Sequence, residues 1–258
     1  MSRAEISTPD LGPEPPPDEV PGAARWPSRT VVALAAAAGC AVVLVAAGAR
    51  LTAEATRGPT AAERAAASTA EVARRYRAWP AGRIFPAEVP YTPAEGAAET
   101  ARRVGIGTDT RCGTAVDAAL VGPLAARGCR AVLRATYLDQ PQGLAVTVGV
   151  AAFPDERSAR AAAALFPSRA SGPGLRALPF AGSVAARFGD AARQSSAVAQ
   201  TGPYVVAATV GYADGRPTLR ARQQQADVPA LAPRVAAAIL RPLTTPAPIH
   251  CNTQDWSC

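Results

Sequence analysis

An uncharged stretch of 20 residues, 30–49, is the most apolar part of the chain. A helix of that length rises about 30 Å, which matches the hydrocarbon core of a bilayer. The sequence therefore predicts a transmembrane helix that contacts the lipid bilayer through residues 30–49. A cleaved lipoprotein signal at Cys40 is disfavoured, because the apolar run continues for nine residues beyond it. A buried helix of a soluble protein is disfavoured too, since no comparable stretch is present to surround it.

The segment after the apolar stretch predicts a stalk over residues 50–80. Thr60 and Glu63 have the spacing of a capping box, in which each side chain bonds the backbone amide of the other residue. A helix is therefore expected from about 61 to 78, and Pro80 ends it.

The less polar residues of this helix form a seam with spacings of three and four that ends at Tyr76 and Trp79. A coiled-coil dimer is one interpretation of the seam. Docking of Tyr76 and Trp79 on the following domain is the favoured one, because the seam is short and strengthens toward its end.

Residues 81–245 carry the patterns of one mixed domain. Three prolines within 81–96 predict an extended or looped segment. A short strand is expected near 101–107, and a short helix interrupted or kinked at Pro123 is expected within 112–129. The loop 167–182, rich in proline and glycine, is expected to be irregular.

Two stretches combine a strand hairpin with a helix. Residues 130–153 contain two strand-like runs around a polar turn, and alternate positions of the second run are apolar: Leu144, Val146, Val148 and Val150. A helix follows within 154–167. The same order recurs as a hairpin over 193–217 and a helix over 227–243, and the tripeptide TVG lies late in a strand each time.

This order of elements predicts an α+β fold. Two ββα units would assemble into one antiparallel sheet with helices on one face. The expected domain covers residues 81–245, and residues 246–258 form a tail.

The phrase CRAVLRATYLDQPQGLAVTVGVAAFPDERSARAAA, with a short leader and one apolar helix before it, resembles uncharacterised single-pass envelope proteins of high-GC actinobacteria. The resemblance covers roughly residues 70–245. The architecture is also similar to the extracellular sensor domains of actinobacterial receptor kinases. The resemblance implies an extracytoplasmic domain and supplies no catalytic motif.

Composition changes this picture little. The 63 alanines blur the hydrophobic periodicity, and the 27 basic residues are all arginines. The net charge is −2 over residues 1–29 and +9 over residues 50–258. Because the arginines are scattered singly or in pairs and never form a long run with interleaved aromatic residues, we predict no nucleic-acid partner. An anionic wall polymer suits the same basic surface.

The leader, residues 1–29, is rich in proline and nearly free of large apolar residues, which predicts a disordered tail. Arginines flank both ends of the apolar stretch, so their count does not decide the orientation. The four cysteines beyond the stretch favour an oxidising compartment. We therefore expect a cell-membrane protein with a cytoplasmic N-terminus and an extracytoplasmic C-terminal domain.

Those four cysteines allow three pairings. We expect Cys112 to pair with Cys129 and Cys251 with Cys258, because each pair is close in sequence. Closing either loop stabilises the fold by about 2.5 to 3 kcal/mol on the chain-entropy model. Residues 246–258 would then be a disulfide-clasped tail.

The same tail contains a conceivable set of metal ligands, which are His250, Cys251, Asp255 and Cys258. Adjacent histidine and cysteine rarely reach one ion, and the spacing of the cysteines matches no common zinc motif. We therefore predict no metal site and no cofactor.

Catalytic patterns are weak throughout the chain. The single histidine and the lack of a G-x-S-x-G motif argue against a serine hydrolase. Glycoside hydrolysis needs two opposed carboxylates, and the candidates are Asp109, Asp117, Asp155 and Glu156. Asp155 and Glu156 lie at the start of a predicted helix, where the helix dipole accounts for acidic residues without catalysis. The tripeptide GIG at 105–107 lacks the third glycine of a phosphate loop and is expected to be a turn.

We therefore expect a protein that is not an enzyme and that carries an extracytoplasmic binding or sensor-type domain. An envelope protein or an anionic wall polymer is its expected partner. The alternative is a cell-envelope hydrolase whose carboxylate pair the sequence does not reveal. A third hypothesis, a cytosolic zinc-binding regulator, requires the opposite orientation in the membrane.

Overall fold

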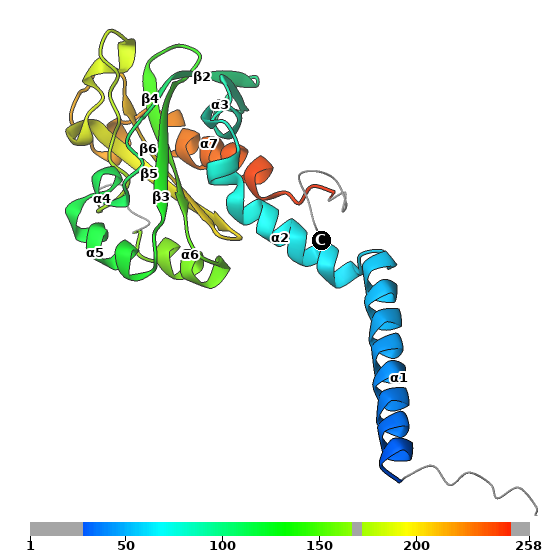
Figure 1. The fold of residues 1–258 in the computed structure, drawn as a ribbon. Coiled ribbons are helices and arrows are strands. Elements are labelled where there is room, and N and C mark those ends of the chain that lie inside the picture. Colours follow the sequence, from blue (N-terminus) through cyan, green and yellow to red (C-terminus); the bar gives the residue numbers. More distant parts are fainter. Residues whose placement is uncertain (1–27, 167–171, 249–258) are drawn as a thin grey trace, which may run out of the picture. The chain divides into compact units, whose positions relative to one another are not determined.

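The computed structural model describes residues 28–166 and 172–248, in two compact units that divide the chain after Gly58 (Figure 1). The predicted tails therefore lie largely outside the described residues. The first unit contains helix α1, Ser28–Thr56, which is longer than the predicted 30–49. A stretch of 18 residues within it has a mean hydropathy of 2.5, and no residue of the helix is buried. By length and composition, α1 can cross a membrane.

The second unit opens with helix α2, Ala61–Ala78, which confirms the predicted helix and its Thr60–Glu63 capping box. A four-residue helix α3, Ala81–Ile84, comes next, where an extended or looped segment was expected. That expectation was wrong at these residues, because Pro80 stands at the N-cap, where the missing amide of proline costs nothing.

Six strands form one antiparallel sheet in the order β1-β2-β3-β4-β6-β5. Their bounds are β1 Glu88–Tyr91, β2 Glu99–Ile106, β3 Ala131–Leu138, β4 Leu144–Ala152, β5 Arg193–Thr201 and β6 Tyr204–Tyr212. Both predicted hairpins are therefore confirmed. The two TVG tripeptides meet where β4 pairs with β6, since Thr147 lies opposite Thr209. The predicted α+β class with an antiparallel sheet is correct.

One face of the sheet is covered by α2 and by helix α7, Asp227–Thr244. Alternate residues of β4 and β6 point into this face, including the predicted apolar set Leu144, Val146, Val148 and Val150. Buried residues on α7 recur at helical spacing, from Val228 through Leu231 and Val235 to Ile239. We call this the α7 face.

The opposite face is covered by three short helices: α4 Cys112–Ala115, α5 Ala118–Ala126 and α6 Glu156–Ala163. Residues 172–192, which we call the strap, cross the rest of this face. The strap contains two short 3-10 helices, Val184–Arg187 and Asp190–Ala192, and no strand. We call this side of the sheet the strap face.

The helices are thus divided between two faces, whereas the sequence suggested one. The reason is burial: all nine residues of β4 and all nine of β6 are buried, so both faces need cover. Consequently α6 and α7 follow equivalent hairpins but pack on opposite faces, and the two ββα units are not related by symmetry.

The predicted interruption of the 112–129 helix also lies elsewhere. The chain leaves the helical conformation at Val116, which forms an antiparallel bridge with Leu175 of the strap. Pro123 instead lies inside α5. A long-range pairing therefore set the break, and the local proline signal did not.

Helix α2 docks on the α7 face through its C-terminal half, as the seam predicted. The hydroxyl of Tyr204 donates to the carbonyl of Val72 at 2.6 Å and accepts from the amide of Tyr76 at 3.2 Å. Trp79 packs against the same cluster, partly buried.

Arg75 links α2 to α7, and only 1% of it is exposed. Its guanidinium pairs with Glu71 and donates through Nη1 to the carbonyls of Pro242, Leu243 and Thr245, at 3.1, 3.0 and 2.7 Å. The last carbonyls of a helix have no intrahelical partner, and they carry partial negative charge. Arg75 therefore caps the C-terminus of α7.

Candidate functional site

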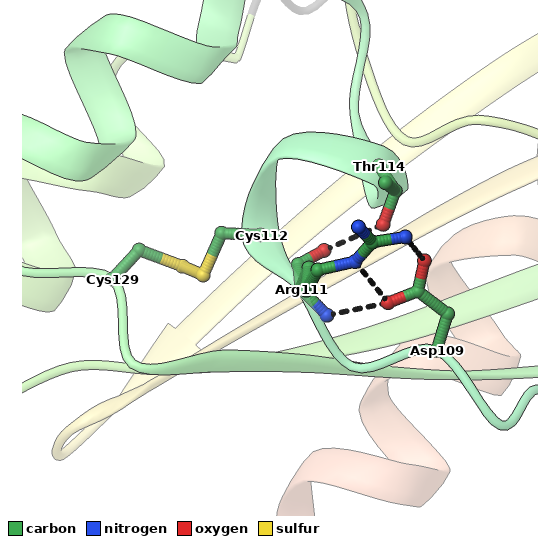
Figure 2. Close-up of a disulfide and its surroundings, with 5 residues drawn as sticks. All are labelled: Asp109, Arg111, Cys112, Thr114 and Cys129. Carbon is green, nitrogen blue, oxygen red and sulfur yellow. Dashed lines mark hydrogen bonds and ion pairs between the residues drawn. A yellow bond between two sulfur atoms is a disulfide. The ribbon is translucent and has the colours of Figure 1, made fainter.

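The disulfide Cys112–Cys129 is the one predicted site that lies within the described residues and is formed there (Figure 2). It joins the first residue of α4 to a residue two positions before β3, with 6.4 Å between the Cα atoms. Cys251 and Cys258, like His250 and Asp255, lie outside the described residues. Cys40 is free and exposed on α1.

Each of the carboxylates considered for hydrolysis accepts hydrogen bonds from, or forms an ion pair with, a neighbouring group in the structure. Asp109 accepts from the backbone amide of Arg111 and from its guanidinium, at 3.0 and 2.8 Å (Figure 2). These donors lower the pKa of Asp109 well below its usual range. Asp109 is therefore ionised and stabilises the loop before α4.

Asp117 and Asp155 are structural in the same way. Asp117 accepts from the amide of Gly174 and from Nη1 of Arg193, both at 2.8 Å, and so fixes the start of the strap. Asp155 caps α6 by accepting from the amide of Ser158 at 2.8 Å, which lowers the pKa of its carboxyl. The neighbouring Glu156 pairs with Arg160 on the surface of α6.

The GIG tripeptide is not a turn, and this prediction was wrong. Gly105 and Ile106 belong to β2, where the ladder shifts register between Arg103 and Gly105. A Cβ at Gly105 would overlap the ring of Phe180 in the strap. The glycine is there because the strap passes close to the strand.

A polar hollow of about 370 Å³ lies at the corner formed by β1, β2 and the turn between β3 and β4. It is lined by Glu88, Thr100, Arg102, Leu138, Asp139, Gln140 and Gln142. Both charge signs and two amides face this volume, and Leu138 is its one apolar lining residue.

The walls of the hollow are held in place by hydrogen bonds. The amide of Leu144 donates to Asp139 at 2.9 Å and the amide of Thr100 donates to Gln140 at 3.3 Å. Gln142 has a φ of 60°, a left-handed conformation that is uncommon for a residue with a side chain. The turn therefore presents its polar groups on a fixed backbone.

Asp139 is the most buried carboxylate of the hollow, with 7% of the residue exposed. Burial raises the pKa of its carboxyl, and the nearby carboxylates Glu99 and Asp227 raise it further. Glu99 also accepts from the hydroxyl of Tyr91, whose pKa is raised by burial and by this bond. Two further carboxylates, Glu99 and Asp227, thus lie close enough to Asp139 to disfavour its ionised form.

Sequence patterns did not reveal this hollow. Its residues do leave a signal, since Thr100 and Arg102 alternate along one face of β2 and two glutamines occupy the β3–β4 turn. The same pattern is typical of any solvated strand. Only the fold shows that this corner of the sheet forms a hollow.

Within residues 28–166 and 172–248, no group of three histidine, cysteine or acidic side chains is placed to hold a metal ion. Comparison with known proteins gives no further guide to the site: no protein-family model matches the chain, and neither a curated protein nor a solved structure is significantly similar to it.

Proposed function

We propose that this protein is a single-pass membrane protein whose folded domain is a non-catalytic, extracytoplasmic binding module. Helix α1 carries the proposal: it is 29 residues long, has no buried residue, and contains an 18-residue stretch with a mean hydropathy of 2.5. Eight large apolar side chains of this helix are exposed, namely Val31, Val32, Leu34, Val42, Val43, Leu44, Val45 and Leu51. Exposure of so many apolar groups is unfavourable in water and favourable in lipid.

The Cys112–Cys129 disulfide supports the extracytoplasmic side, because such bonds persist in oxidising compartments. Protease treatment of intact cells tests the orientation. We expect loss of the domain from Pro59 onward. Protection of the domain would contradict the orientation and favour the cytosolic alternative.

Thiol counting on the non-reduced full chain provides a second test of the compartment. We expect one reactive thiol, Cys40, with the other four cysteines oxidised. Five reactive thiols would contradict both the compartment and the proposed pairing of Cys251 with Cys258.

The hollow at the β1–β3 corner is the proposed ligand site. Its carboxylates accept hydrogen bonds, Arg102 donates them, and the amides of Gln140 and Gln142 do both. A small, polar ligand rich in hydroxyl or amide groups suits this lining, because six of its seven residues are polar or charged. Because the backbone of the β3–β4 turn is fixed, less conformational entropy is lost when a ligand binds.

Titration of the labelled protein with N-acetylglucosamine, followed by NMR, tests the site. We expect shifts confined to residues 88–102 and 138–144, and their loss in Gln142→Ala. Gln225→Ala is the matched control, because Gln225 is exposed and lies outside the hollow. Shifts that survive in Gln142→Ala would place the ligand elsewhere.

Glu88 and Asp139 line the same hollow, and this favours the alternative of a cell-envelope hydrolase. Release of nitrophenol from chromogenic glycosides tests it. The hydrolase alternative requires turnover that disappears in both Glu88→Gln and Asp139→Asn, while the binding module requires none in the wild-type protein.

A further inference from the structure

The two edges of the sheet differ in how they are protected. Strand β1 is four residues long, contains Pro90, and has Glu88 paired across to Arg102. Short length, proline and charge are the devices that keep an edge strand from pairing with another chain. Strand β5, at the other edge, is nine residues long, contains no proline and has one charged residue, Arg193 at its start.

The backbone groups on the outer edge of β5 follow from its register. A two-residue turn joins β5 to β6, so Thr201 and Tyr204 form a hydrogen-bonded pair. Hydrogen-bonded and non-hydrogen-bonded pairs alternate in an antiparallel ladder. The amides and carbonyls of Ser196, Val198 and Gln200 therefore point away from β6.

These outward groups are almost unpaired among the described residues. The hydroxyl of Thr201 donates to the carbonyl of Gln200 at 2.8 Å, and within residues 28–166 and 172–248 no other hydrogen bond reaches the outward groups of the three residues. Unpaired strand groups form a template for one more strand.

We infer that β5 pairs antiparallel with β5 of a second copy of this chain, about a two-fold axis at Val198. In that register Val198 faces its twin, and Ser196 faces Gln200 of the second copy. All three side chains are uncharged, so no like charges oppose each other across the axis. A charged partner strand would find no complementary charge on Ser196, Val198 or Gln200.

The protected β1 edge makes this assembly a closed dimer. Pairing through β5 uses the open edge of both copies, and the remaining edges are the β1 strands, which are short and contain proline. Isologous contacts of this kind close after two copies. If α1 anchors both copies in one membrane, as proposed above, their effective concentration rises as well; the pairing itself does not depend on the anchor.

Sedimentation of the full chain in detergent tests the pairing without reference to orientation in a membrane. Val198→Pro removes the outward amide, and proline is tolerated on an edge strand at such a position. Val198→Ala is the matched control, because it keeps the amide. We expect a dimer for the wild-type protein and Val198→Ala, and at least a tenfold larger dimer dissociation constant for Val198→Pro. Equal constants for the two variants would overturn the inference.

Cross-linking keeps the inference testable if Val198→Pro fails to fold. Opposed residues of a hydrogen-bonded pair have Cα atoms about 5.5 Å apart, within the range that a disulfide spans. In a Cys40→Ser background, we expect Val198→Cys to form covalent dimers on mild oxidation. Glu88→Cys, on the β1 edge, is the control. A wild-type monomer whose Val198→Cys form cross-links no more than Glu88→Cys would also overturn the inference.

Discussion

The two faces of the sheet are covered by different means. On the α7 face, two regular helices bury a continuous apolar cluster, and one charged group, Arg75, joins them. On the strap face, short helices and an irregular segment are held by a disulfide, by ion pairs and by close passage over glycines. The comparison shows that apolar burial suffices where a long helix presents a regular stripe. A segment without such a stripe needs several specific contacts.

The strap illustrates the second case. Asp190 binds the guanidinium of Arg176 and the backbone amide of Ala177, both at 2.8 Å. The backbone of Leu178 donates to Thr147 at 3.0 Å and accepts from Thr136 at 2.7 Å. Paired in this way, the buried polar groups of the strap avoid the cost of desolvation.

The largest expected effect is on the α7 face. Arg75→Met leaves Glu71 and the last carbonyls of α7 without their donor in a buried setting. Removing one partner of such a pair costs about 3 to 5 kcal/mol. Urea unfolding of the detergent-solubilised protein measures the loss, and Arg77→Met, at an exposed position on the same helix, is the control. A loss below about 1 kcal/mol would mean that apolar burial alone holds α2.

On the strap face, the disulfide has the next largest effect. The double variant Cys112→Ser with Cys129→Ser frees the loop that α4 and α5 occupy. The chain-entropy model gives a loss of about 3 kcal/mol. Reducing agent should lower the unfolding midpoint of the wild-type protein more than that of the double variant, which retains only the expected Cys251–Cys258 bond. An unchanged wild-type midpoint would show that the strap face does not depend on the bond.

The substitution Gly211→Ala tests how closely the strap must approach the sheet. A methyl group at this position of β6 would overlap the carbonyl oxygen of Ala192 and the ring of Phe188. Overpacking of this kind costs about 1 to 3 kcal/mol. The expected loss is seen in thermal unfolding. Gly189→Ala is the control, because a Cβ there meets nothing within 4 Å. Equal stability of the two variants would show that the strap can shift.

The smallest expected effect concerns Asp139 at the hollow. Its pKa in the folded protein is raised by burial, so the protonated form favours folding. That contribution is complete below the ordinary carboxyl pKa of about 4 and is lost as pH rises through the raised value. Asp139→Asn cannot ionise, and its side-chain oxygen still accepts from Leu144. The variant should therefore gain stability relative to the wild-type protein between pH 4 and pH 7. If the variant instead gained stability relative to the wild-type protein as the pH falls, the pKa of Asp139 would not be raised in the folded protein.

Much of the fold was predictable because its signals are local. The Thr60–Glu63 capping box, the alternation in β4 and the short spacing of Cys112 and Cys129 each involve residues close in sequence. Failures arose where distant contacts overrode a local cue. Val116 broke a helix by pairing with Leu175, and Gly105 served close packing in place of a turn.

The sequence by itself determined an apolar helix long enough for a membrane, a capped helix after it, two strand hairpins and a local disulfide. Tertiary structure alone decided the two covered faces, the cap of α7 by Arg75, the polar hollow and the open edge of β5. Arg75 and the carbonyls it binds are 167 to 170 residues apart. Periodicity and local capping patterns report only neighbours along the chain, whereas the capping of a distant helix by a buried arginine, or a hollow, depends on which surfaces the finished fold brings together or leaves bare.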